Sequence, residues 1–197
     1  MALLIKGIVV GFSIAAPVGP IGILCIRRTL AEGRWTGLAV GLGAATADAL
    51  YGCIAGLGLS YISKALLSMQ SSIQVLGGLF LLYLGFKSFT AKPEETESEL
   101  TATSIPKAFG STLLLTLTNP ATILAFTALF ASIGLGEVSK SATSSLVFVL
   151  GVFCGSAGWW LLLTGGVSLF RKKVTLTHRL WINRISGTIL TLFALTA

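Results

Sequence analysis

Charged residues are scarce in this chain of 197 residues, where Asp, Glu, Lys and Arg together make up 11%. A typical soluble domain has about 25%. Apolar residues reach 54%, and the mean hydropathy is +0.89. We therefore expect an integral membrane protein with very little chain outside the bilayer. The length fits a single domain, residues 1–197.

The patterns of common enzymes and nucleic-acid-binding proteins are also missing. There is no Gly-rich phosphate loop after a strand pattern and no Gly-x-Ser-x-Gly elbow. A lone histidine, His178, makes no metal cluster, and one intramembrane aspartate makes no catalytic dyad. The net charge of +7 comes from loops between apolar runs, which does not suggest nucleic-acid binding. We expect no enzyme, no metal or other cofactor, and no nucleic-acid partner.

Cysteine is limited to three residues, and none forms a Cys-x-x-Cys pair. Cys25, Cys53 and Cys154 all fall inside apolar runs, which favours small buried hydrophobic side chains. The alternative is a transmembrane thiol–disulfide electron conductor in which Cys25 and Cys154 meet. Neither has a resolving partner nearby in the sequence. A purely structural membrane subunit is a third alternative.

Six apolar runs predict an all-α fold of six transmembrane helices. The runs are approximately Leu3–Ile26, Gly37–Leu59, Gln70–Phe89, Ala108–Leu135, Ser144–Phe170 and Leu180–Ala197. The uninterrupted part of the last run, Ile185–Ala197, is short for a span. It crosses the bilayer only if the turn Leu180–Arg184 is included and Arg184 reaches back to the interface.

The distribution of Lys and Arg predicts the orientation in the membrane. The first, third and fifth loops carry eleven of the fourteen: Arg27, Arg28, Arg34, Lys87, Lys92, Lys107, Arg171, Lys172, Lys173, Arg179 and Arg184. The other side carries only Lys6, Lys64 and Lys140. Cytoplasmic loops are enriched in positive residues, so these three loops should be cytoplasmic and both termini periplasmic or extracellular.

The third loop divides the chain into two halves of three spans each. Repeat one covers approximately residues 1–90, a polar linker covers 91–107, and repeat two covers 108–197. Because three is odd, the second half enters the membrane the other way up, which is the inverted-repeat plan of many secondary transporters. Placing Pro20 on Pro120 gives a weak internal match. In that match the acidic residue of the first half has no counterpart.

That acidic residue, Asp48, lies in an apolar run whose other ionisable group is the phenol of Tyr51. A carboxylate near the middle of a bilayer costs about 2.5–3.5 kcal/mol, so it normally faces the bundle interior and binds an ion, a proton or a substrate. The alternative is interhelical hydrogen bonding to Ser or Thr, for which an uncharged Asn or Gln would suffice. We expect Asp48 to bind a substrate ammonium group, carry a coupling proton, or do both in turn.

Two proline motifs interrupt spans one and four at similar depth, Pro17-Val18-Gly19-Pro20 and Asn119-Pro120. Each proline removes a backbone donor, and Gly19 tolerates dihedral angles that other residues avoid. Pro20 and Pro120 suit the first turn of a restarted helix, and Asn119 is a good N-cap. Helix N-termini attract carboxylates. The motifs therefore predict a substrate site, with packed kinks that bind no ligand as the alternative.

These residues resemble a known family. Pro17-x-Gly19-Pro20, followed by Arg28, Gly33, Gly37, Gly41, Ala47-Asp48 and Gly56-Leu-Gly58, is similar to the N-terminal signature of the lysine-exporter (LysE/RhtB) family. Thr118-Asn119-Pro120 resembles its second-half motif. The resemblance covers essentially the whole chain. It implies a six-span bacterial inner-membrane exporter of amino acids or related metabolites, with protons as the coupling ion.

Together, the residues and the resemblance predict a secondary-active exporter. Its substrate would contact Asp48 and the breaks at Pro17–Pro20 and Asn119–Pro120. Arg27 and Arg28, at the cytoplasmic end of span one, are topogenic residues or a gate. The expected partners are a small-molecule substrate and the lipid bilayer, with self-association left open.

Overall fold

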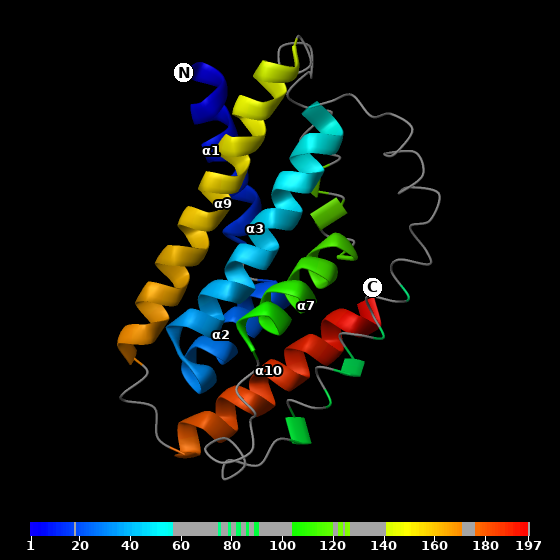
Figure 1. Cartoon of the computed structure of the whole chain (residues 1–197). Coiled ribbons are helices and arrows are strands. Elements are labelled where there is room, and N and C mark those ends of the chain that lie inside the picture. The colour runs from blue at the N-terminus through cyan, green and yellow to red at the C-terminus, as the bar shows by residue number, and fades with distance from the viewer. Residues whose placement is uncertain are drawn as a thin grey trace.

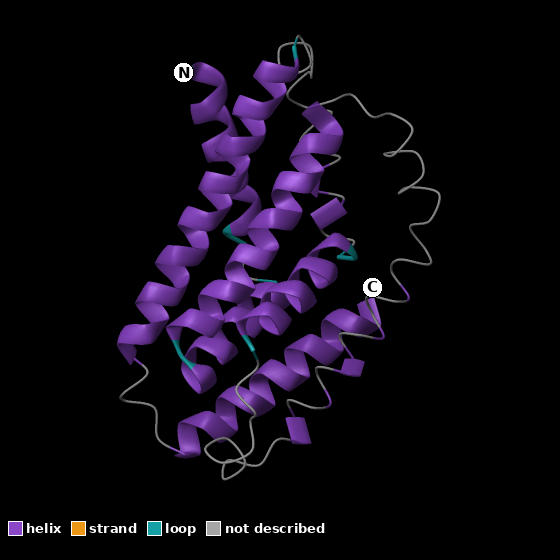
Figure 2. Ribbon diagram, viewed as in Figure 1, coloured by secondary structure: helices purple, strands orange, loops and turns teal. Residues whose placement is uncertain are grey.

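A computed structural model gives the fold as an assembly of helices, with no strand in the ranges described (Figures 1 and 2). It describes residues 1–17, 19–56, 104–119, 141–170 and 176–196, with single residues between 75 and 90 and between 122 and 126. Most of the third predicted span, Gln70–Phe89, and most of the predicted linker lie outside the described residues.

The first span consists of two helices. Helix α1 covers Ala2–Ala15 and α2 covers Pro20–Glu32, and their axes meet at 80°. Helix α2 continues past the predicted end at Ile26 because its last turn forms an ion pair from Arg28 to Glu32, four residues apart. Gly33 then reverses the chain with φ 105°, a dihedral angle that a side chain would disfavour.

Four further helices follow the apolar runs with shifted ends. Helix α3 covers Arg34–Gly56, α7 covers Ile105–Leu117, α9 covers Ala142–Phe170 and α10 covers Leu176–Thr196. Helix α7 begins inside the predicted linker because Ser104 at the N-cap and a proline in the first turn form a helix start. Helix α10 has 21 residues and includes the Leu180–Arg184 turn.

Helices α1 and α9 run parallel and in backbone contact (Figure 1). A Cβ atom added to Gly11 would lie 2.0 Å from the carbonyl oxygen of Val152, and one added to Gly155 would lie 2.0 Å from that of Ile8. Glycine is therefore required for this approach. We call these two helices the α1–α9 pair.

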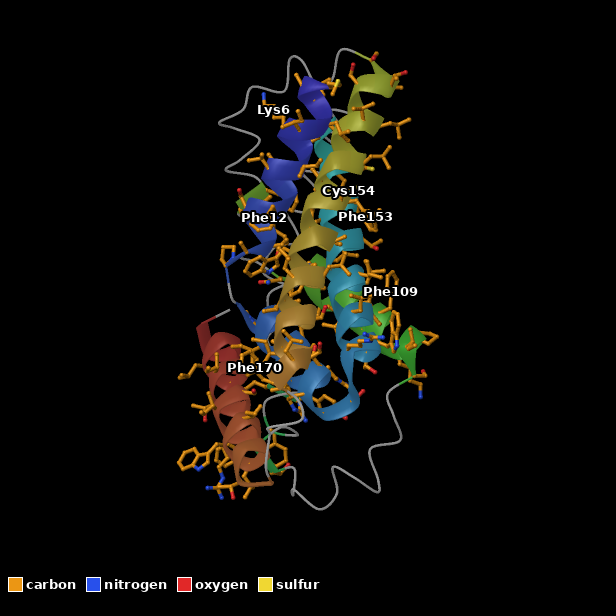
Figure 3. The ribbon with its side chains drawn as sticks, turned by 90° about the vertical axis from the view of Figure 1, so that its left-hand side faces the viewer. Lys6, Phe12, Phe109, Phe153, Cys154 and Phe170 are labelled. Carbon is orange, nitrogen blue, oxygen red and sulfur yellow. The ribbon has the colours of Figure 1, made fainter. Side chains whose placement is uncertain are left out.

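Helices α3 and α7 form a second parallel pair, the α3–α7 pair. A Cβ atom on Gly43 would lie 2.4 Å from the carbonyl oxygen of Phe109. One end of the contact is fastened by the hydroxyl of Tyr51, which donates a hydrogen bond of 2.6 Å to the carbonyl oxygen of Leu117. Figure 3 shows Phe109 on α7, beside α3.

The two pairs meet mainly where α3 packs against α9. At this contact the two helices are antiparallel. The glycines of α3 contact side chains of α9, not its backbone. Gly41 lies against the Cβ and ring of Trp160, and Gly52 lies against the Val149 side chain. Helix α2 packs mostly on α3, and α10 packs on α2. The glycine-rich packing expected for membrane helices is thus observed.

The outer surface of this assembly is apolar, whereas hydroxyls and the carboxyl group of Asp48 lie inside. Val9, Leu114, Leu150 and Leu162 are among the many large hydrophobic side chains that are exposed. Helices α3 and α9 are each long and apolar enough to cross a bilayer, and the bent pair α1 and α2 passes the same test as one span. An apolar exterior of this extent fits a lipid environment.

Candidate functional site

Asp48 is buried at the contact between the two helix pairs, with 3% of its surface exposed. The hydroxyl of Ser156 on α9 donates a hydrogen bond of 2.7 Å to its Oδ2 atom. The indole Nε1–H of Trp160, one turn further along α9, donates to the Ser156 oxygen at 3.2 Å. These three residues form one directed chain of hydrogen bonds that ends on the carboxylate. The sequence prediction that Asp48 faces the bundle interior is confirmed.

Two hydrophobic clusters lie on either side of Asp48 along α3. One contains Ala45, one turn before the aspartate, together with Trp160. The other contains Tyr51, one turn after it, together with Val152. Ser156 lies between Val152 and Trp160 in the same way on α9. The carboxyl group and its hydroxyl partner therefore lie at the junction of two apolar regions, where a charge has little contact with water.

The first helix break flanks this junction on one side. Ala15 at the end of α1 and Ile21 at the start of α2 both belong to the cluster that contains Ala45. Gly19 occupies the N-cap position of α2, and no side chain among the described residues caps this N-terminus. The first-turn residues Ile21 and Gly22 are buried, so their N–H groups lie away from water. Pro17 itself is exposed.

The reason expected for glycine at position 19 is wrong. Its backbone is extended, with φ −102° and ψ −164°, and any residue adopts such angles. A Cβ atom added to Gly19 would meet no described atom within 4 Å. Neither a strained dihedral angle nor a close neighbour among the described residues therefore accounts for this glycine. Among the described residues the backbone at Gly19 is therefore uncovered, as a site for a close-lying ligand requires.

The second break flanks Asp48 on the other side. Helix α7 ends at Leu117, and the carbonyl oxygen of Asn119 accepts hydrogen bonds from the N–H groups of Thr122 and Ile123 at 3.1 Å each. Asn119 thus begins a new helical turn, as expected for an N-cap position. The Leu117 carbonyl is satisfied by Tyr51, and Tyr51 also stacks on Phe126 beyond the break. Pro120 lies outside the described residues.

The proposed gate residues occupy the far end of α2 from this junction. Arg28 is paired with Glu32, and the Arg27 side chain is half-buried. Both are therefore separated from Asp48 along the bundle, and their assignment as a gate remains a prediction. The cysteines are free: Cys25 is buried on α2 and Cys154 is exposed on α9, where Figure 3 labels it. Nothing in this arrangement supports the thiol–disulfide alternative.

Ser156 and Tyr51 are the site residues that sequence reasoning missed, whereas for Trp160 it left open a place in the core or in a cavity lining. When the two halves of the sequence are compared, Ser156 and Trp160 fall in the glycine-rich stretch of the second half that corresponds to the stretch around Asp48. Neither residue carries a charge or belongs to a recognised motif. A signal existed in their spacing of four residues, which places a hydroxyl and an indole N–H on one helix face. Tyr51 was noted only as an ionisable group, whereas its hydroxyl caps a helix end.

Comparisons with known proteins give one family match and several relatives. The family described as LysE type translocator matches residues 12–197 of the chain. A Bacillus subtilis protein named "Putative amino acid efflux protein YcgF" is 29% identical over 191 residues, covering 95% of this chain and 89% of the relative. The Escherichia coli "Uncharacterized membrane protein YahN" is 29% identical over 175 residues, covering 86% and 77%. No solved structure gives a significant match.

Proposed function

The chain belongs to the LysE type translocator family and is a membrane transporter rather than an enzyme, and we propose that it exports amino acids or related metabolites across the bacterial inner membrane in exchange for protons. Family membership confirms the resemblance found in the motifs. The proposal rests on one observation above all: a carboxyl group is buried between two helix breaks, with a hydroxyl as its hydrogen-bond donor.

We propose further that the two halves form an inverted repeat. Helix α7 runs opposite to α1, because α1 is parallel to α9, α9 is antiparallel to α3, and α3 is parallel to α7. The close contact in each pair also uses matching atoms. A Cβ atom added to Gly43 would lie 2.4 Å from the carbonyl oxygen of Phe109 and 3.1 Å from the nitrogen of Leu113, four residues later. A Cβ atom added to Gly151 would lie 2.5 Å from the carbonyl oxygen of Leu4 and 3.0 Å from the nitrogen of Ile8, again four residues later.

The contact between α3 and α9 supports the same symmetry. The residue shift that carries Gly43 onto Gly151 also carries Gly41 onto Val149 and Gly52 onto Trp160. The contact of Gly41 with Trp160 and that of Gly52 with Val149 are therefore images of each other. The shift carries Asp48 onto Ser156, its own hydrogen-bond partner. This register differs from the one that superposes Pro20 on Pro120, and it gives the aspartate a counterpart.

In the proposed site, a zwitterionic substrate is held at both charged ends. Its ammonium group pairs with Asp48, which offsets the free energy that burial of a lone carboxylate costs. Its carboxylate lies at the N-terminus of α2, beside the backbone of Gly19, and at the turn that begins at Asn119. A proton entering from outside then neutralises Asp48 and releases the substrate.

Three further features are proposed from the sequence pattern and the family. The loops rich in Lys and Arg are cytoplasmic, and both termini are periplasmic or extracellular. The transporter is one domain divided into two repeats by the linker of residues 91–107.

Export is tested with the purified wild-type protein in liposomes. We expect radiolabelled amino acids loaded inside to exchange with the same unlabelled amino acid outside, at least about tenfold faster than from protein-free liposomes. We also expect a pH gradient to drive their accumulation on the acidic side. A panel of the twenty common amino acids identifies the substrate. Absence of exchange and of any thermal stabilisation across the panel would exclude amino-acid export.

Gly19→Leu is expected to reduce export about tenfold or more while leaving the fold intact. The leucine side chain covers the backbone at the α2 N-terminus, where we place the substrate carboxylate. Gly110→Leu on α7 is the matched control, because a Cβ atom there also meets no described atom within 4 Å. Initial export rates and thermal midpoints of the two variants are compared. Wild-type export by Gly19→Leu would remove Gly19 from the site.

A further inference from the structure

The hydrogen bond from Ser156 to Asp48 joins two bodies that are each tightly packed. Within the α1–α9 pair the backbones touch at Gly7, Gly11, Gly151 and Gly155. Such backbone contact leaves no flexible side chain between the helices, so the pair moves as a unit. The α3–α7 pair has the equivalent contact at Gly43 and the hydrogen bond of Tyr51.

The contact between the two pairs is different in kind. Where α3 meets α9, the neighbours of the glycines are the side chains of Trp160, Thr164 and Val149. The nearest atoms at each of these glycines belong to side chains, so this contact constrains relative movement less than the backbone contacts within each pair. Across it, the buried carboxylate of Asp48 is held by a hydrogen bond of 2.7 Å from the other body.

Trp160 fixes the direction of this hydrogen bond. Its indole N–H is a donor only, and it is directed at the Ser156 oxygen. The hydroxyl hydrogen of Ser156 is thereby left for Asp48. Ser156 can therefore hold an ionised Asp48 well. An ammonium group or a proton on the carboxylate reduces the negative charge that strengthens this hydrogen bond, and so weakens it.

The chain crosses between the two bodies at the first helix break. Helix α1 belongs to the α1–α9 pair, whereas α2 packs mostly on α3. Relative movement of the bodies must therefore change the angle between α1 and α2, which is 80° in this conformation. The break at Pro17–Pro20 thus lies where a hinge is needed.

We propose that Ser156 is a positioning residue that keeps the empty transporter in one conformation by holding Asp48 of the α3–α7 pair to the α1–α9 pair. Substrate or proton binding at Asp48 weakens this hydrogen bond and frees the two bodies to move. The inference rests on the proposed function. It explains why the transporter does not switch between its two access states when neither substrate nor proton is bound. Obligatory exchange requires this restriction.

The test measures the distance between the two bodies without any substrate. Spin labels are attached at Val9→Cys on α1 and Leu114→Cys on α7, both at exposed positions, in a background where Cys25, Cys53 and Cys154 are serine. The ligand-free protein is placed in lipid nanodiscs, and pulsed electron paramagnetic resonance gives the distance distribution. With Ser156 present we expect one dominant distance.

Ser156→Ala is expected to raise the ratio of a second distance to the first by about tenfold, as for loss of a hydrogen bond to a charged group. Trp160→Phe keeps the Ser156 hydroxyl but loses the donor behind it, and we expect a smaller rise in the same direction. The Trp160→Phe variant still tests the proposal if the Ser156→Ala variant does not fold. Thr164→Val is the matched control, since this buried hydroxyl donates to the Trp160 carbonyl of its own helix. It should leave the distribution unchanged.

An unchanged distance distribution in both Ser156→Ala and Trp160→Phe overturns the proposal, even if their thermal midpoints fall. A merely structural hydrogen bond would lower the midpoint without creating a second distance. Because no substrate is present, the result is separate from the export assay. Absence of export with a Ser156-dependent distance change would remove the proposed function and retain the mechanical role of Ser156.

Discussion

Asp48→Asn is expected to lower pH-driven export by about 100-fold while leaving the thermal midpoint unchanged or a few degrees higher. Asparagine keeps the side-chain volume and still accepts the hydrogen bond from Ser156. It loses the charge that pairs with a substrate ammonium group and the site that carries the proton. Removing one partner of a buried charge pair typically costs about 2–5 kcal/mol, which corresponds to this loss.

A loss of export without a fall in the thermal midpoint distinguishes a functional role of Asp48 from a role in packing. A carboxylate inside the membrane costs about 2.5–3.5 kcal/mol to insert, so its replacement by a neutral amide relieves the fold of that cost. If Asp48 served only to hold α3 to α9, the weaker acceptor in the variant would lower the midpoint and leave export in place. The measurements are export driven by a pH gradient in liposomes and thermal unfolding of the same preparations.

Thr46→Val is the control for the aspartate variant. Thr46 lies on the same helix, two residues before Asp48, and its hydroxyl donates to the Leu42 carbonyl within α3 at 2.8 Å. Valine keeps the shape and removes a polar group that does not reach α9, so export should stay within about twofold of the wild type. Wild-type export by Asp48→Asn, with a lowered midpoint, would leave Asp48 a structural role only.

Much of the helical arrangement could be predicted from the sequence, because the bilayer imposes a simple length and polarity rule. The run Ser144–Phe170 became α9 with its end unchanged and its start two residues earlier. Differences arose where local signals act outside the apolar run. The Arg28–Glu32 pair extended α2, and Ser104 with the following proline began α7 early. These signals are weak individually and do not change hydropathy.

The site was predicted only in part, because its partners come from helices distant in the sequence. A buried carboxylate is costly wherever it lies, so Asp48 could be identified from its run alone. Ser156 is chemically ordinary in a membrane helix, and its role depends on α3 and α9 being antiparallel in one register. That register is set by glycines that meet side chains on one face and backbone on another, which spacing alone does not resolve.

Gly155→Ala is expected to prevent stable assembly, although it adds only one methyl group. The added carbon would lie 2.0 Å from the carbonyl oxygen of Ile8 and 2.9 Å from its Cα atom. The backbone of Ile8 cannot change rotamer as a side chain can, so α1 and α9 must separate along the contact. We expect a loss of about 3 kcal/mol or more, which lowers the thermal midpoint by roughly 6–12 °C or abolishes accumulation in the membrane.

Gly158→Ala provides a control on the same helix, one turn further on. A Cβ atom there meets no described atom within 4 Å, so alanine should stabilise α9 by about 0.5–1 kcal/mol through its better helix propensity. The two variants make the same chemical change at neighbouring positions, and only the contact with α1 differs. Equal midpoints would show that α1 and α9 are not in backbone contact, and the two-body arrangement on which the role of Ser156 depends would fail with it.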